Sequence, residues 1–217
     1  MSGAAQQEQR IGPDELAQHL LGLKGGARRL VAIAGAPGSG KSTFAQGLCA
    51  DLNRRVPDVA CVLAMDGFHF DDRVLEARGQ RARKGAPHTF DVPGLAAMLG
   101  RLKADDGSEI AVPVFDRSIE IARAGAEIIP RSARLVVVEG NYLLLDAPGW
   151  SALQSYFDVT VMLEVPRDVL AQRLLARWRG YGMDEAAIRA KLLENDLPNV
   201  DLVLSQSVSA QFVVANT

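Results

Sequence analysis

The most constraining feature of this chain is a glycine-rich octapeptide that begins at Gly35. Residues 35–42 read Gly-Ala-Pro-Gly-Ser-Gly-Lys-Ser and fit the pattern Gly-x-x-x-x-Gly-Lys-Ser/Thr of a phosphate-binding loop. Glycines in such a loop let the backbone curl around an anion and aim successive N–H groups at it. Lys41 would reach the β- and γ-phosphates, and the hydroxyl of Ser42 would bind Mg²⁺. The motif therefore predicts a site for a nucleoside triphosphate.

The segments on either side of this loop support that interpretation. Residues 30–34 form an apolar run typical of a buried parallel strand, and Phe44, Leu48 and Leu52 recur at helical spacing. A helix that begins directly after the loop would point its positive end at the bound anion. A glycine-rich turn without a ligand is the alternative. We assign the nucleotide contacts to Gly35, Ala36, Pro37, Gly38, Ser39, Gly40, Lys41, Ser42 and Thr43.

Composition limits the classes of protein to which the chain can belong. Its 217 residues are 48% hydrophobic and 23% charged, which predicts one globular domain over residues 1–217. The net charge of −2 lacks the basic excess of general nucleic-acid binders, and no apolar run approaches the length of a membrane span. We therefore expect a cytoplasmic protein with no nucleic-acid or membrane partner, and a homodimer if it oligomerises.

The two cysteines, Cys49 and Cys61, are too few for a disulfide framework. They are not at metal-ligand spacing either. We interpret both as small core residues.

Apolar runs and helical patterns alternate along the chain. This alternation predicts an α/β fold, a P-loop NTPase with a doubly wound, mainly parallel sheet flanked by helices and a short lid. Beyond the segments around the loop, strands are expected at residues 59–65, 110–115, 135–139, 159–165, 200–204 and 212–214. Helices are expected after Pro13, over residues 95–102, after Pro166 and over residues 184–195.

Two acidic residues stand at the ends of predicted strands, where open α/β sheets bind ligands. Asp66 follows the strand 59–65; it could accept a proton from an attacking hydroxyl, bind Mg²⁺ through water, or merely form an Asp-Gly turn with Gly67. Glu139 ends the strand 135–139, and we favour a role behind Mg²⁺ because a buried carboxylate without a partner is costly.

Three polar segments are further candidates for the site. Residues 71–88 are basic and are either a substrate-facing segment or a solvated surface. Asp116 and Arg117 could hold hydroxyls and an anion, or form an exposed pair. Arg177 and Arg179 could belong to a lid over residues 177–184, or simply complement the helix dipole.

Five segments together resemble the uridine kinase, phosphoribulokinase and bacterial pantothenate kinase family of P-loop kinases. They are residues 35–42, 65–69, 84–91, 112–117 and 138–144, which read in the order of the family and span about half of the chain. Within the family the chain looks most like a branch labelled fructose transport system kinases.

This resemblance implies an ATP-dependent kinase that phosphorylates a hydroxyl of a sugar, a nucleoside or a pantothenate-like alcohol. It implies that Asp66 is the catalytic base, that Glu139 lies near Mg²⁺, and that Asp116 with Arg117 contacts the substrate. The implied catalytic residues are Lys41, Asp66, Arg177 and Arg179, the substrate-binding residues are Asp66, His69, His88, Asp116 and Arg117, and the metal ligands are Ser42 and Glu139.

The alternative from another class is a regulatory ATPase or switch that acts on a protein partner. The chain contains no Asn-Lys-x-Asp guanine signature, which argues against a Ras-type GTPase. A switch would hydrolyse ATP at a rate set by its partner, whereas a kinase would consume ATP in step with a metabolite.

Overall fold

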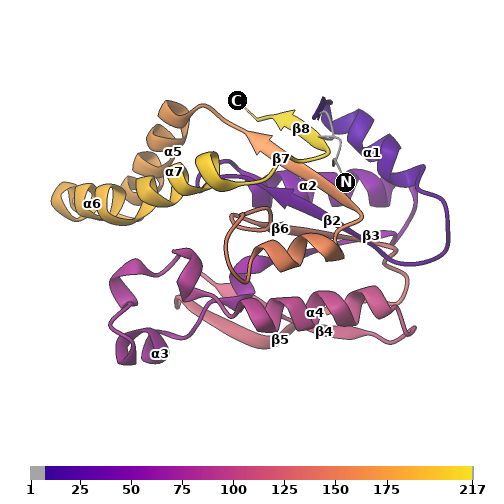
Figure 1. Cartoon of the computed structure of the whole chain (residues 1–217), viewed down its shortest axis with the longest axis horizontal. Coiled ribbons are helices and arrows are strands. Elements are labelled where there is room, and N and C mark those ends of the chain that lie inside the picture. Colours follow the sequence, from indigo (N-terminus) through magenta and orange to yellow (C-terminus); the bar gives the residue numbers. More distant parts are fainter. Residues whose placement is uncertain (1–7, 217) are drawn as a thin grey trace, which may run out of the picture.

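The computed structural model describes residues 8–216, and its main feature is a six-stranded sheet in the order β1-β8-β7-β2-β6-β3 (Figure 1). Every pair of neighbouring strands in this sheet is parallel, which confirms the predicted mainly parallel sheet. The strands are β1 (Gln9–Arg10), β2 (Arg29–Ala34), β3 (Ala60–Ala64), β6 (Leu135–Gly140), β7 (Val159–Glu164) and β8 (Phe212–Ala215).

Helices cover both faces of the sheet because the central strands are apolar on both sides. Val31 and Ile33 of β2 face a core layer beneath α1 and α2, whereas Leu30 and Ala32 face a second layer beneath α4, α5 and α7. The sheet is therefore doubly wound, as predicted. The helices are α1 (Pro13–Leu21), α2 (Lys41–Arg55), α3 (Asp72–Ala77), α4 (Val92–Ala104), α5 (Arg167–Gly180), α6 (Glu185–Lys191) and α7 (Leu197–Gln206).

The predicted strand at residues 110–115 exists, but it does not join the main sheet. It is β4 (Ile110–Asp116), which pairs antiparallel with β5 (Ile121–Ile129) in a separate two-stranded sheet. The pairing register shifts between Val112 and Val114, beside Pro113, which lacks an N–H group. We did not predict β5, because its small residues and Gly125 show weak strand propensity.

One predicted strand is wrong. Residues 200–204 lie in α7, and only residues 212–214 form a strand, within β8. The run Val-Asp-Leu-Val-Leu is mostly apolar, which suggests a strand, but Pro198 stands in the first turn of a helix. The side chains that the fold buries are Val200 and Val203, which are three residues apart and share one helix face.

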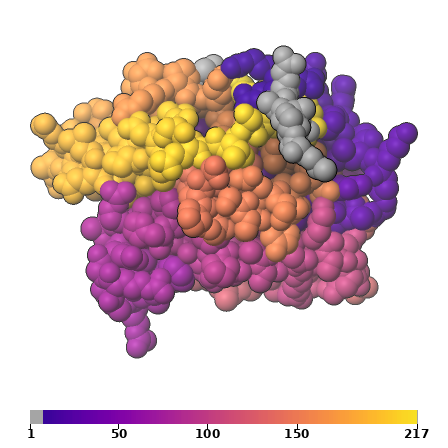
Figure 2. Space-filling model, in the orientation of Figure 1, coloured from indigo at the N-terminus to yellow at the C-terminus, as the bar shows by residue number. Residues whose placement is uncertain are grey.

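The connection between α6 and α7 is a π-helical turn, Leu192–Asp196. Together, α5, this turn and α7 form an arm that lies above the segment around α3 (Figures 1 and 2). Two hydrogen bonds join these parts: Arg83 donates to the carbonyl of Glu194, and Asn195 Nδ2 donates to the carbonyl of Lys84 at 3.0 Å. The arm and the basic segment therefore enclose a space at the carboxyl ends of the strands.

Both cysteine thiols are free; Cys49 is buried and Cys61 is half-buried. Burial raises the pKa of each to about 12, which suits inert core thiols. None of the helices within residues 8–216 is both long and apolar enough to cross a bilayer.

Candidate active site

The loop between β2 and α2 has the backbone of an anion cradle. Gly38 and Gly40 have φ values of +84° and +82°, a left-handed conformation that glycine adopts without steric cost. Lys41 is the first residue of α2, and its Nζ donates to the carbonyl of Ala36 at 3.1 Å. Burial lowers the pKa of Lys41 from 10.5 to about 8, although Glu139 and Asp66 act in the opposite direction. Within residues 8–216 this buried amine forms no ion pair, so its charge would be stabilised by an anion bound in the loop.

A hydroxyl and a carboxylate meet beside the loop. Ser42 Oγ donates to Glu139 Oε1 at 2.9 Å, because β2 and β6 are neighbours and both end at this edge of the sheet. Burial and Asp66 raise the pKa of Glu139, whereas Lys41 and the Ser42 hydrogen bond oppose the rise. Within residues 8–216 no group of three or more His, Cys, Asp or Glu could hold a metal by itself. These two oxygens fit Mg²⁺, which commonly takes few protein ligands and completes its shell with phosphates and water.

A second group of polar residues is built around Asp66. This residue lies in the 3₁₀ turn Met65–Phe68, which follows β3 directly. Arg117 Nη2 donates to Asp66 Oδ2 at 2.6 Å, although the two residues are 51 positions apart. The contact forms because the β4–β5 sheet packs on this turn, where a Cβ added to Gly67 would lie 2.5 Å from the carbonyl oxygen of Pro113.

The geometry around His69 defines its tautomer. Its ring packs against Phe90 and Phe115, with centroid distances of 4.0 and 4.8 Å. Nδ1 lies 2.8 Å from the carbonyl oxygen of Asp66, and because a carbonyl can only accept, Nδ1 carries the hydrogen. Burial lowers the pKa of His69, which favours the neutral ring. Nε2 is then a hydrogen-bond acceptor.

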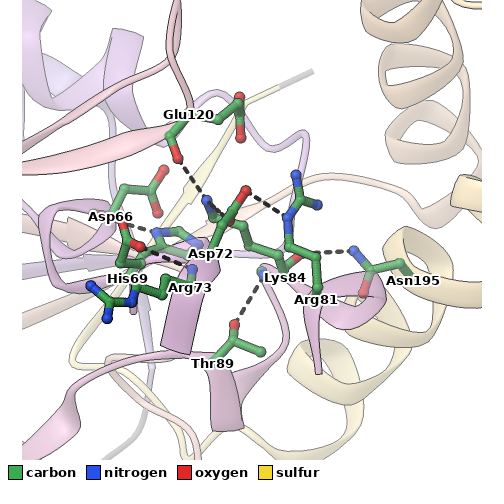
Figure 3. A network of polar contacts seen from close by, with 11 residues as sticks. Asp66, His69, Asp72, Arg73, Arg81, Lys84, Thr89, Glu120 and Asn195 are labelled. Carbon is green, nitrogen blue, oxygen red and sulfur yellow. Dashed lines mark hydrogen bonds and ion pairs between the residues drawn. The ribbon is translucent and has the colours of Figure 1, made fainter. Parts of the chain in front are cut away.

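A network of ion pairs follows in the basic segment (Figure 3). Lys84 Nζ donates to Asp72 Oδ1 and to the carbonyl of Glu120, each at 2.6 Å, and Arg81 pairs with the other oxygen of Asp72 at 2.5 Å. The hydroxyl of Tyr142 donates to the carbonyl of Gly85 at 2.7 Å and fixes this segment to the core. Residues 71–88 therefore contribute to the wall of the site. This agrees with a segment that faces the site and not with a merely solvated surface.

Most of the predicted site residues line one cavity of about 430 Å³. Its walls include the predicted residues Pro37, Gly38, Gly40, Lys41, Ser42, Thr43, Asp66, His69, Arg117, Glu139 and Arg177. Gly35, Ala36 and Ser39 belong to the same loop, where Ala36 and Ser39 are buried.

Besides Gly35, Ala36 and Ser39, three predicted site residues do not line this cavity. His88 is exposed, and Asp116 Oδ1 accepts hydrogen bonds from Ser118 in the β4–β5 turn. Arg179 forms an exposed pair with Glu185 at 2.8 Å. Arg179 is two positions beyond Arg177 on α5, and two helical positions differ by about 200° around the axis, so the two side chains leave opposite faces. These positions lend no support to a direct role for the three residues.

Sequence reasoning missed several polar residues that line the cavity. Trp178 Nε1 donates to Asp196 Oδ2 at 2.6 Å, and burial raises the pKa of Asp196. Asn195 and Asn199 are also buried beside it. In the sequence this stretch resembles the solvated end of an amphipathic helix, so no local signal identifies it. Lys84 did have a signal, because it opens one of the segments that carry the family resemblance.

The sequence is similar to those of several known proteins. The model of the Phosphoribulokinase / Uridine kinase family matches residues 30–214. The chain is 34% identical over 192 residues to the "Uncharacterized protein YggC" of Escherichia coli K12, a match that covers 88% of this chain and 78% of that protein. It is 32% identical over 200 residues to the "Putative uridine kinase C227.14" of Schizosaccharomyces pombe, covering 88% and 85% of the two chains.

A solved structure extends the similarity to three dimensions. The crystal structure of a "putative fructose transport system kinase" from Silicibacter sp. TM1040 matches with a TM-score of 0.87 and 41% identity. The match covers 94% of this chain and 98% of that one.

Proposed function

The chain belongs to the phosphoribulokinase / uridine kinase family, and we propose that it transfers the γ-phosphoryl group of Mg-ATP to a hydroxyl of a sugar, a nucleoside or a pantothenate-like metabolite. It is a kinase that acts on an alcohol group of a small molecule. The observation that carries the proposal is the convergence, in one cavity, of the phosphate-binding loop, the Ser42–Glu139 pair and the Asp66 carboxylate.

On the nucleotide side, the N–H groups of the loop and Lys41 hold the β- and γ-phosphates. Ser42 and Glu139 would hold Mg²⁺, which supplies neutralisation of the phosphate charge when bound. Arg177 lines the same cavity near Lys41, whose pKa it helps to lower. Its guanidinium is placed to stabilise negative charge that develops on the transferred group.

On the acceptor side, Asp66 receives the proton of the attacking hydroxyl. The hydroxyl oxygen forms a bond to the γ-phosphorus, and the bond from the γ-phosphorus to the β–γ bridging oxygen breaks, so that ADP leaves with the electron pair. Arg117 holds Oδ2 of Asp66 at 2.6 Å, which orients the carboxylate. Positioning and fixed charge supply most of the catalysis in such reactions, so this small set of side chains is sufficient.

We infer the narrower class of substrate by analogy with the proteins that this chain resembles. The names of the similar proteins mention a nucleoside and a fructose transport system, and the structural relative at 41% identity favours a fructose-type sugar. The reaction needs neither nucleic acid nor a membrane, and the cytoplasmic location and the homodimer remain predictions.

The test is phosphorylation by the purified protein with Mg-ATP and a panel of sugars, nucleosides and pantothenate-like alcohols. We expect one class to gain a phosphoryl group, detected by product mass, in step with ADP release. Asp66→Asn should keep nucleotide affinity but lower turnover by about 10²- to 10⁴-fold, the usual loss for a general base. Asp146→Asn, an exposed carboxylate outside the cavity, is the matched control. Slow ATP hydrolysis that no acceptor stimulates would instead favour a regulatory ATPase.

A further inference from the structure

The acceptor half of the cavity is balanced in charge. We define the nucleotide half as the phosphate-binding loop with Lys41, Arg177 and Glu139, and the acceptor half as the remaining wall around Asp66. The acceptor half is lined by the cations Arg81, Lys84, Arg117 and Lys191 and by the carboxylates Asp66, Glu120 and Asp196. The fourth carboxylate, Asp72, does not line the cavity but pairs with both Arg81 and Lys84. Surplus positive charge therefore lies only where the phosphates of the nucleotide would bind.

The cations of the acceptor half are already engaged. Arg117 pairs with Asp66 at 2.6 Å, and Asp72 binds both Arg81 and Lys84. Lys191 Nζ lies 4.5 Å from the ring centroid of Trp178, and its charge lowers the pKa of Asp196, partly offsetting the rise caused by burial. A carboxylate or phosphate on the acceptor would have to take Arg81, Lys84 or Arg117 from its carboxylate, which would leave that carboxylate unpaired in a partly buried site. Otherwise it would have to draw Lys191 away from the face of Trp178.

Hydrogen-bond acceptors, in contrast, remain available. Asp196 is only 8% exposed, and Trp178 bonds one of its oxygens. No donor within residues 8–216 bonds the other oxygen, Oδ1, and the residue lines the cavity. His69 offers Nε2 to the same space, because its Nδ1–H is used by the Asp66 carbonyl. Neither acceptor is sealed in the core, so each can accept a hydrogen bond from a ligand or from water in the cavity.

The π-helical turn explains why Asp196 points inward. Such turns widen a helix by one residue and often occur at functional sites. Here the turn brings Asn195 and Asp196 to the buried side together, and Asn195 joins the turn to the carbonyl of Lys84 at 3.0 Å. The π-helical turn is therefore hydrogen-bonded to the segment that carries the ion pairs of Arg81 and Lys84 (Figure 3).

We propose that this half of the cavity binds an uncharged, polyhydroxylated acceptor of the carbohydrate class and selects against acceptors that carry a carboxylate or phosphate. Hydroxyls of the acceptor donate to Asp196 and to Nε2 of His69 while a further hydroxyl faces Asp66. The proposal rests on the proposed kinase activity and narrows its substrate class. An uncharged polyol suits the site because it supplies several donors and disturbs no ion pair.

The experiment compares acceptors in pairs of one neutral and one acidic molecule: D-fructose with D-fructose 6-phosphate, glycerol with D-glycerate, and panthenol with pantothenate. We expect kcat/KM to favour the neutral member by at least about tenfold, since like charges brought together in a desolvated site repel each other. Asp196→Asn keeps the shape and the bond to Trp178 but removes the charge, so it should lower that ratio. Asp201→Asn on α7 should leave the ratio unchanged, because Asp201 pairs with Arg167 outside the cavity.

Two variants of His69 test its acceptor nitrogen. The amide nitrogen of His69→Asn can replace Nδ1–H, but this variant has no group at the ε position. His69→Gln places an amide oxygen near the position of Nε2. We expect KM for the neutral acceptor to rise more in His69→Asn than in His69→Gln, with KM for ATP changing little in either. A merely structural role, in which the bond to Asp66 matters, predicts the reverse order.

Calorimetric titration of the same pairs into the protein without ATP separates this proposal from the proposed function. Tighter binding of neutral members, lost in Asp196→Asn, would support the inference even if no product formed and phosphotransfer were refuted. Preference for the acidic members, equal binding within each pair, or no binding of any member would overturn it. Product formation with the acidic members preferred would keep the kinase and refute the proposed selectivity.

Discussion

Replacing Lys41 by methionine should stabilise the fold while it abolishes activity. Burial lowers the pKa of Lys41 from 10.5 to about 8, so the folded chain without nucleotide holds this charge at a cost on the order of 3 kcal/mol. The variant also loses the 3.1 Å hydrogen bond to Ala36, which contributes about 1 kcal/mol. We therefore expect Lys41→Met to raise the free energy of unfolding by about 2 kcal/mol at pH 7, or Tm by roughly 4–8 °C.

The pH dependence of this difference follows from the direction of the pKa shift. Below pH 8 both the folded and the unfolded wild type keep the proton on Lys41, and the cost is complete. Between pH 8 and 10.5 the folded state releases the proton while the unfolded state retains it, so the cost shrinks as pH rises. The advantage of Lys41→Met should be largest at neutral pH and disappear by about pH 10.5.

Urea unfolding at several pH values, with and without Mg-ATP, measures both effects. Nucleotide at about 100 times its Kd should stabilise the wild type by about 2.7 kcal/mol and leave Lys41→Met unchanged, which would reverse their order. The control is Lys24→Met, the same substitution at an exposed lysine, which should change stability by less than about 0.5 kcal/mol. A Lys41→Met variant less stable than the wild type at pH 7, or an advantage independent of pH, would refute the reasoning.

Three further predictions concern single residues. Glu139→Gln should raise the Mg²⁺ concentration needed for half-maximal turnover by about tenfold or more, measured by magnesium titration, and an unchanged midpoint would remove Glu139 from the metal site. Gly67→Ala should lower the free energy of unfolding by about 1–3 kcal/mol in urea titrations, because its Cβ would lie 2.5 Å from the Pro113 carbonyl oxygen; wild-type stability would contradict that contact. Arg177→Ala should lower kcat by about tenfold or more, whereas Arg179→Ala should change it less than about twofold, and equal losses in steady-state assays would mean that Arg179 also reaches the transferred group.

The backbone conformation of the loop at residues 35–42 could be predicted because it depends on local residues. All of its residues lie within one turn and the start of one helix, and Gly38 and Gly40 have the left-handed backbone that the motif requires. The acids at strand ends were also accessible, since parallel strands bring their carboxyl ends to one edge of the sheet. That rule places Asp66 and Glu139 close to the loop.

The acceptor side depended on contacts between distant segments. The sequence shows both Asp66 and Arg117 but not their ion pair, which forms only because the β4–β5 sheet packs on the turn after β3. The apolar run in residues 200–204 suggested a strand, yet the segment is helical and buries Val200 and Val203, which share one helix face. Local pattern and tertiary packing disagreed there, and packing determined the structure.

The sequence by itself therefore determined the fold class, the nucleotide loop and the two acids beside it, because these follow from short-range backbone geometry and from strand order. Only the tertiary structure decided which of two neighbouring arginines faces the cavity, and that Asp196 enters it through a π-helical turn. The direction of a side chain depends on how a helix is rotated against its neighbours, and that rotation is set by packing over the whole chain.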